Sequence, residues 1–323
     1  MKRSKSKTVD FLAATTLTCS QLTTDSQLFV TGYEEYLRCV LGLAAETRRR
    51  YLPFATRFFT EHCAAGATDW SGFDSSSVAS FVRTESKRLK TPGHRAPVTA
   101  IRSILRFLVF KGLIGPELID AVPRSRRYKH ASLPVQLTEH QLALTLDACR
   151  GDGPTALRDR AILLLLSQLG VRAKEIIQLR LEDINWSEGT MTFRSTKSLR
   201  ERTLPLTKDV GQSLAQYLQK GRPQSTSRFV FLRRTYPHLQ FQTSGAVSYL
   251  VRRYLTRAGL KLSRTGAHVL RHTAATHMIR SGVSFKEVAD ILGHKSIDTT
   301  VIYAKVDLTN LASVVLPWPG GGK

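Results

Sequence analysis

The sequence predicts a mainly α-helical protein with a small antiparallel β-sheet, arranged as two domains. Its 323 residues exceed the length at which a single hydrophobic core usually stops growing. Apolar residues recur at a spacing of three to four along most of the chain, which is typical of amphipathic helices. The apolar residues alternate with a period of two only within residues 184–206, so we expect the sheet there, in the second domain.

Residues 25–115 are predicted to form a helical domain. Four segments carry apolar stripes at helical spacing: 27–42, 45–63, 75–89 and 96–112. In the last of them, Pro97 fits the first turn and Gly112 fits the end. Residues 1–24 start with "MKRSKSK" and continue rich in Thr and Ser, so we interpret them as a mobile basic N-terminal arm, with a signal peptide as the weaker alternative.

Residues 116–136 are interpreted as a basic interdomain linker, because they hold three prolines and no sustained period. The second domain is expected over residues 137–306. Thr138 and Gln141 have capping-box spacing at its start, and a strongly apolar helix is expected to stop at Gly170. In residues 184–206 the segment "TKSLRE" is the expected hairpin turn. Residues 307–323 are expected to form a C-terminal helix and tail, which could dock on a neighbouring subunit or on its own domain.

The charge balance points to a polyanionic partner. There are 48 Lys and Arg against 25 Asp and Glu, a net charge of +23. Basic residues exceed acidic ones by 21 to 11 in residues 1–130 and by 27 to 14 in residues 131–323, which favours two surfaces that hold one nucleic acid. A basic binding protein without enzymatic activity, or a merely solvated surface, is the alternative on charge alone.

Other classes are disfavoured by composition. No apolar run reaches the length of about 18 residues that a membrane span needs, so we expect no membrane. The four cysteines are scattered without a CxxC pair, which argues against a metal site and suits a reducing cytoplasm.

Basic side chains at helical spacing are candidates for contacts to a phosphate backbone. Three groups stand out, one in each of two helices and one in the linker: Arg48, Arg49 and Arg50; Arg95, Arg102 and Arg106; Arg124, Arg126 and Arg127.

The C-terminal part of the second domain holds a group of candidate catalytic residues. In "AHVLRHTAATHMIRSG", His268 and Arg271 are three apart and share a helix face, whereas His272 must point elsewhere. In "LGHKSIDTTVIY", His294 and Tyr303 would lie about 13.5 Å apart on a continuous helix. Gly293 can end the first helix and Ser296 can cap a new one, so the chain can fold back and bring the two side chains together.

The segments "GVRAKEIIQL", "HVLRHTAATHMI" and "LGHKSIDTTVIY" together resemble the signature motifs of the tyrosine recombinases, also called the phage integrase family. The resemblance covers about residues 137–306 and extends more weakly into the helical domain. It implies a helical core-binding (SAM-like) DNA-binding domain followed by an α+β catalytic domain. Three motifs in this order and spacing are a specific signal.

The resemblance also implies the roles of single residues. Tyr303 matches the nucleophile that attacks a DNA phosphodiester and becomes a 3′-phosphotyrosine, leaving a free 5′-hydroxyl. Arg172 and Arg271 match the pair that binds the non-bridging oxygens. These roles suit the residues, since guanidinium groups match phosphate oxygens, and a phenol with a pKa near 10 needs surrounding positive charge to react.

Further positions match assisting roles. His268 corresponds to a histidine that assists proton movement, and His294 to the His/Trp position beside the scissile phosphate. Lys197 corresponds to the hairpin lysine that protonates the leaving 5′-oxygen, although a register slip would favour another basic residue of the hairpin, Arg194, Arg200 or Arg202, or Lys208. Glu175 matches a supporting acidic position, and His272 is assigned a supporting role.

The implied function is site-specific strand exchange in DNA integration, excision or transposition. It would act on double-stranded DNA, as a homotetramer and with related recombinases or accessory proteins, in the bacterial cytoplasm at the nucleoid. Neither cofactor nor metal is expected. A type IB topoisomerase-like enzyme and an inactive DNA-binding accessory protein are the alternatives, and the target sequence stays open.

Overall fold

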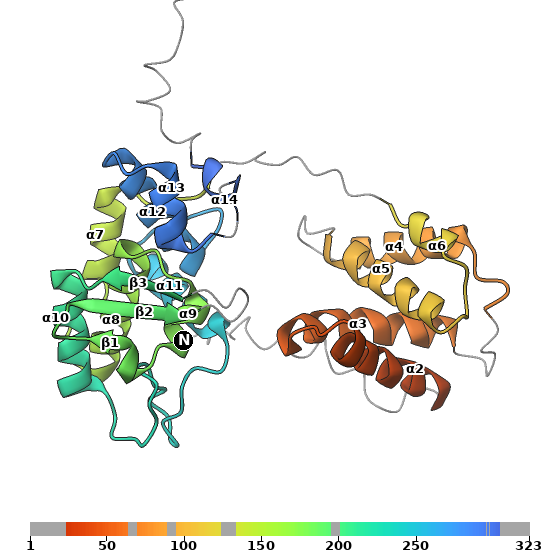
Figure 1. Ribbon diagram of the computed structural model, residues 1–323, viewed down its shortest axis with the longest axis horizontal. Helices are drawn as coiled ribbons and strands as arrows, with labels where there is room; N and C mark the ends of the chain where they lie inside the picture. The colour runs from red at the N-terminus through yellow and green to blue at the C-terminus, as the bar shows by residue number, and fades with distance from the viewer. Residues whose placement is uncertain are drawn as a thin grey trace, which may run out of the picture. The chain divides into compact units, whose positions relative to one another are not determined.

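The computed structural model describes residues 24–63, 70–88, 95–123, 134–194, 201–294, 296 and 298–303 (Figure 1). The chain divides into two compact units, Met1–Tyr128 and Lys129–Lys323. Each unit has its own hydrophobic core, because the buried apolar residues of each pack among themselves. Within the described ranges, no helix combines the length and apolarity that a bilayer span requires.

The first unit is helical. Its elements are α2 (Thr24–Glu35), the π-helical turn η2 (Tyr36–Val40), α3 (Ala45–His62), α4 (Ser75–Arg88), α5 (Arg95–Phe110) and α6 (Glu117–Asp120). Aromatic rings fill the core: Phe58 on α3 is fully buried and lies 5.1 Å from the ring of Phe81 on α4. Arg57 adds a polar link between the same helices, since its guanidinium donates to both carboxylate oxygens of the buried Glu85.

The second unit combines helices with the predicted sheet. Its elements are α7 (Glu139–Asp147), α8 (Pro154–Gln168), α9 (Ala173–Gln178), the 3-10 turn η3 (Leu181–Asp183), β1 (Ile184–Asn185), β2 (Thr190–Arg194), β3 (Glu201–Pro205), α10 (Lys208–Gln216), the π-helical turn η4 (Tyr217–Gly221), α11 (Ser244–Arg257), α12 (Ala267–Arg280), α13 (Phe285–Leu292) and α14 (Asp298–Val301). The predicted fold class is confirmed: helices dominate, and one small sheet lies in the second unit (Figure 1).

The sheet is antiparallel with the order β1-β2-β3. Strand β2 pairs with β3 from Thr190 opposite Pro205 to Arg194 opposite Glu201. Met191, Phe193 and Leu204 are buried, as the period of two requires for a sheet with one face on the core. The turn between β2 and β3, with Lys197, lies outside the described residues.

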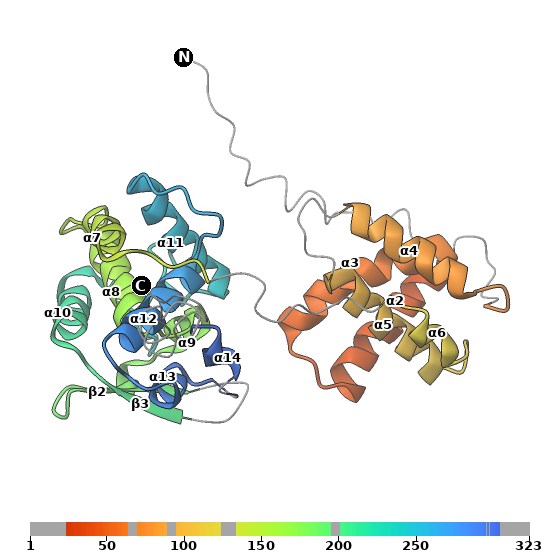
Figure 2. The ribbon, with the colours of Figure 1, turned by 90° about the horizontal axis from the view of Figure 1, so that it is seen from above.

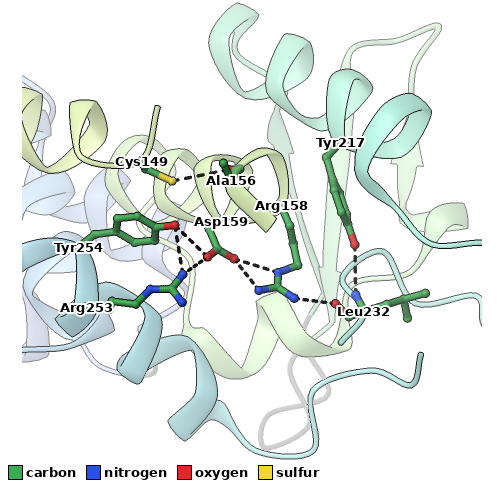
Figure 3. A network of polar contacts seen from close by, with 8 residues as sticks. All are labelled: Cys149, Ala156, Arg158, Asp159, Tyr217, Leu232, Arg253 and Tyr254. Carbon is green, nitrogen blue, oxygen red and sulfur yellow. Dashed lines mark hydrogen bonds and ion pairs between the residues drawn. The ribbon is translucent and has the colours of Figure 1, made fainter. Parts of the chain in front are cut away.

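A buried carboxylate fastens α8 to α11 (Figure 3). Asp159 is fully buried and accepts hydrogen bonds from Arg158, from Arg253 and, at 3.1 Å, from the hydroxyl of Tyr254. Two guanidinium groups therefore neutralise one buried charge, which would be costly without partners. Because α8 leads directly into residues 170–172, this network fixes the helix that carries one side of the candidate site.

Helices α12, α13 and α14 form the other side of the candidate site. Helix α13 packs against α12, and α14 packs against α13 (Figures 1 and 2). Gly293 ends α13 with a φ of +64°, the left-handed cap that the sequence predicts. Tyr303 belongs to a small apolar cluster with Ala275 and Leu292, so the chain after α14 is packed against α12 and α13.

Candidate active site

Arg172 stands at the start of α9, two residues after Gly170. Gly170 has a φ of +60°, which lets the chain turn sharply from α8 into α9. The guanidinium donates from Nη2 to the carbonyl oxygen of Gly293 at 2.6 Å and from Nη1 to Glu175 at 3.0 Å. Its side chain is 35% exposed, so it is held in place yet open to a ligand.

Arg271 lies on α12 and is buried. Its Nη1 donates to the carbonyl oxygen of Gly170 at 2.5 Å, and its Nη2 donates to that of Leu292 at 2.7 Å. Both arginines therefore bind the end of α13, on consecutive carbonyl groups, although they come from elements about 100 residues apart. The Arg172 and Arg271 pair that the sequence predicts is brought together by this shared anchor.

Glu175 is buried and binds two arginines. It accepts from Arg172 and, through both carboxylate oxygens, from Arg202 on β3 at 2.9 and 2.7 Å. Burial alone would raise the pKa of Glu175, but the hydrogen bond and charge of Arg202, together with those of Arg172, hold it below its usual range. Arg202 is the residue that sequence reasoning missed, because it was considered only as a rival to Lys197.

His294 follows the cap of α13 directly. Its backbone N–H donates to the carbonyl oxygen of Ala289 at 2.8 Å, and its Nδ1 is 2.7 Å from Oγ1 of Thr300. Burial, followed by the charges of Arg271 and Arg172, lowers the pKa of His294 to about 4. The imidazole is therefore neutral at pH 7.

His268 lies in the first turn of α12, with its ring centroid 6.3 Å from that of His272. Burial and then the charges of Arg271 and Arg172 lower its pKa. The two histidines and Arg264 line one cavity of about 380 Å³.

Tyr303 is only 2% exposed, and its hydroxyl is 2.7 Å from Nδ1 of His272. Burial raises the pKa of Tyr303, whereas the charge of Arg271 opposes this effect. The chain does turn after Gly293, as expected. The hydrogen-bonding contacts that follow are those of Tyr303 with His272 and of His294 with Thr300. His272 contacts the predicted nucleophile, whereas Arg271 contacts the carbonyl oxygens of Gly170 and Leu292, so the two adjacent side chains have separate partners.

The electrostatic balance of the cluster suits an anion. Arg172 and Arg202 pair with Glu175, and Arg271 lies near enough for that carboxylate to act on its pKa, so the arginines exceed the acid by two charges. Burial and Arg172 lower the pKa of Arg271 to about 10, which leaves it charged at pH 7. Such fixed donors stabilise the negative charge that grows on a phosphodiester during its cleavage.

The predicted DNA-contacting arginines differ in their surroundings. Arg49, Arg50 and Arg106 are exposed, although Arg49 forms an ion pair with Glu46. Arg48 and Arg102 are partly buried and donate to the carbonyl oxygens of Leu43 and Val122. The remaining predicted residues and the C-terminal segment are not described: Lys197, the side chain of Arg95, Arg124, Arg126, Arg127 and residues 304–323.

Comparison with known proteins finds one matching family model and similar recombinases. Residues 136–309 match the model of the phage integrase family. The protein y4rF of Sinorhizobium fredii is 38% identical over 298 residues, which cover 91% of this chain and 70% of that protein. Tyrosine recombinase XerA of Pyrococcus furiosus is 28% identical over 277 residues, which cover 85% of this chain and 88% of that protein.

Solved structures show the same fold. The XerH site-specific recombinase bound to a palindromic difH substrate matches with a TM-score of 0.69 and 18% identity, over 94% of this chain and 92% of that one. A lambda integrase tetramer bound to a Holliday junction matches with a TM-score of 0.63 and 18% identity, over 93% and 81%. The family model covers more than half of the sequence, and the chain therefore belongs to the phage integrase family and is a tyrosine recombinase.

Proposed function

We propose that this recombinase cleaves and rejoins DNA strands through a covalent 3′-phosphotyrosine at Tyr303. The supporting observation is the meeting of Arg172 and Arg271 at the end of α13, directly before His294 and ten residues before Tyr303. The two guanidiniums bind the non-bridging oxygens, and Lys197 protonates the leaving 5′-oxygen. The phosphotyrosine conserves the energy of the broken bond, so rejoining needs no nucleotide.

The wider proposal concerns the substrate and the assembly. We infer that the chain acts on double-stranded DNA as a homotetramer, in integration, excision or transposition of a bacterial mobile element in the cytoplasm. The net charge of +23 and the excess of basic residues in both halves support a polyanionic substrate. The tetrameric lambda integrase on a Holliday junction has the same fold, which supports the assembly.

A covalent trap tests the nucleophile. Wild-type protein and Tyr303→Phe are incubated with nicked suicide DNA that carries the element's own ends, and adducts are separated on a denaturing gel. We expect a 3′-linked adduct with the wild type only, because the phenylalanine has no attacking oxygen. Tyr236→Phe is the matched control, since this tyrosine is 89% exposed in the second unit.

The other outcomes separate the alternatives. If both proteins bind the DNA and neither forms an adduct, the chain is a DNA-binding accessory protein and the proposed enzymatic activity is wrong. If the wild type forms the adduct and relaxes supercoiled DNA without joining two sites, the type IB topoisomerase-like activity replaces recombination. Exchange between two marked sites is the result that supports the proposal in full.

A further inference from the structure

His272 makes direct contact with the reacting oxygen of the proposed nucleophile. Its Nδ1 is 2.7 Å from the hydroxyl of Tyr303, and the two ring centroids are 5.6 Å apart. His272 is half-buried and Tyr303 is 2% exposed, so bulk water has little access to this hydrogen bond. A contact of this length, out of bulk water, is within the range in which a general base removes a proton.

The charge state of His272 fits the role of an acceptor. Burial, followed by the positive surroundings of His268, Arg271 and Arg264, lowers the pKa of His272 to about 4. The ring is therefore neutral at pH 7, and the tautomer with its proton on Nε2 leaves a lone pair on Nδ1. The groups that face it are His268 and Arg271 on its own helix, Arg264 in the loop before α12, and Tyr303.

Three other polar groups of the site are engaged or cannot accept, and it is Nδ1 of His272 that contacts the hydroxyl of Tyr303. Glu175 binds Arg172 and Arg202 with both oxygens. Nδ1 of His294 is in contact with Thr300. Arg271 acts on Tyr303 only as a positive charge, since a guanidinium has no acceptor.

We propose that His272 is a catalytic residue, which aligns the hydroxyl of Tyr303 and accepts its proton as the phenol oxygen attacks the phosphate. This inference rests on the proposed function, in which Tyr303 is the nucleophile. The O–H bond of Tyr303 breaks, its proton passes to Nδ1, and the oxygen forms a bond to phosphorus. The bond from phosphorus to the 5′-oxygen breaks with its electron pair, and that oxygen takes a proton from Lys197.

Rejoining runs the same steps in reverse. The 5′-hydroxyl attacks the phosphotyrosine and returns its proton to Lys197, and the leaving phenol oxygen recovers its proton from His272. The negative phosphodiester favours the protonated imidazole while DNA is bound, because an opposite charge raises the pKa of a histidine. The acid and the base thus exchange their roles between cleavage and rejoining, and protons balance over the cycle.

The test measures the rate of adduct formation on suicide DNA in single turnover from pH 6 to pH 9. His272→Asn keeps a polar group near the position of Nδ1 but cannot carry the proton away. We expect a rate about 100-fold below wild type at pH 7, which then rises about tenfold per pH unit because hydroxide must take the proton. The wild-type rate should stay nearly constant over this range, and His277→Asn, on the exposed end of α12, should match it.

A second variant separates proton transfer from packing. His272→Ala should be slow, and added imidazole should restore its rate in proportion to the concentration of neutral imidazole, which a purely structural role would not allow. An unchanged rate in His272→Asn, or an equal decrease at every pH without rescue of His272→Ala, would overturn the inference. A wild type without adduct, or an adduct that persists in Tyr303→Phe, would instead overturn the proposed function.

Discussion

At the scale of single residues, Glu175 organises the positive charge of the site. It binds Arg172 through Nη1 and through the backbone N–H at 2.7 Å, and it binds Arg202 through both carboxylate oxygens. Arg172 cannot then turn away without breaking bonds to two segments of the chain. In the proposed mechanism, a guanidinium that is positioned before DNA arrives lowers the reorganisation needed when charge develops on the phosphate.

Replacing Glu175 with Gln should destabilise the protein and slow cleavage. Two arginines would lose their shared charged partner in a mostly buried place. We expect a cost of about 2 kcal/mol of unfolding free energy, below the ~3–5 kcal/mol of a fully buried pair because Arg172 faces water. Urea denaturation of both proteins measures this difference at pH 7. Glu182→Gln is the control, since its ion pairs with Arg180 and Arg228 are exposed, and little change is expected.

The ion pairs of Glu175 also predict that stability depends on pH. The pKa of Glu175 in the folded protein lies below its ordinary value of 4.5, so its ionised form stabilises the fold above that value. This contribution is lost as the pH falls through the folded pKa, because the carboxyl is then protonated in both states. The difference in unfolding free energy between wild type and Glu175→Gln should shrink below pH 4.5. A difference that stays constant to pH 3 would contradict the ion-pair explanation.

At the scale of elements, the sequence predicts features that depend on residues close together in the chain, such as helix caps. The capping box is formed: the backbone N–H of Thr138 donates to Oε1 of Gln141 at 3.0 Å, and that of Gln141 donates to Oγ1 of Thr138 at 3.2 Å. Gly170 and Gly293 end their helices in the left-handed region, as their spacing to the preceding apolar stripes indicates. These features depend on a few adjacent residues, and the predicted sheet depends on a simple period of two.

Contacts between distant elements could not be read in the same way. Arg202 reaches Glu175 because the register of β2 and β3 points that side chain toward α9, and no local pattern fixes this register. The contact of His272 with Tyr303 joins residues 31 apart, one within α12 and one just after α14. Sequence reasoning placed His272 off the face of Arg271 but had no means to name its partner.

The end of α13 gives a test of close packing. A Cβ at Gly293 would lie 2.5 Å from Nη1 of Arg202 and 3.4 Å from Nη1 of Arg172, whereas a Cβ at Gly282 would meet nothing within 4 Å. Both glycines have positive φ, +64° and +87°, so alanine at either position carries a backbone cost of about 1 kcal/mol. We expect Gly293→Ala to lower adduct formation at least tenfold more than Gly282→Ala, because only the former displaces the arginines.

Two measurements check this comparison. Thermal unfolding gives the backbone cost that both variants share, and the suicide-substrate assay gives the rate of adduct formation. If the two variants lose stability and activity equally, the close approach of the arginines to Gly293 does not matter for catalysis. If Gly293→Ala alone loses activity at similar stability, the end of α13 positions the guanidinium groups.

At the scale of the whole molecule, the chain is built around two separate cores. The first unit is packed with aromatic rings, among them Phe58, Phe59 and Phe81. The second is packed mainly with aliphatic side chains, among them Leu163, Leu165 and Leu166 of α8. Both halves carry excess positive charge, which favours a polyanionic partner for each of them.

Two independent cores predict two unfolding events in the absence of DNA. Phe58→Ala should destabilise the first unit and Leu165→Ala the second, each by about 2–5 kcal/mol, because both side chains are fully buried and leave cavities. In calorimetry each variant should move one transition by several degrees and leave the other in place. Saturating DNA should raise both transitions if both units hold the duplex, since a ligand that binds only the folded state stabilises it. A single transition that shifts as a whole in both variants would show that the two units unfold together. That result would contradict the prediction of two independent cores.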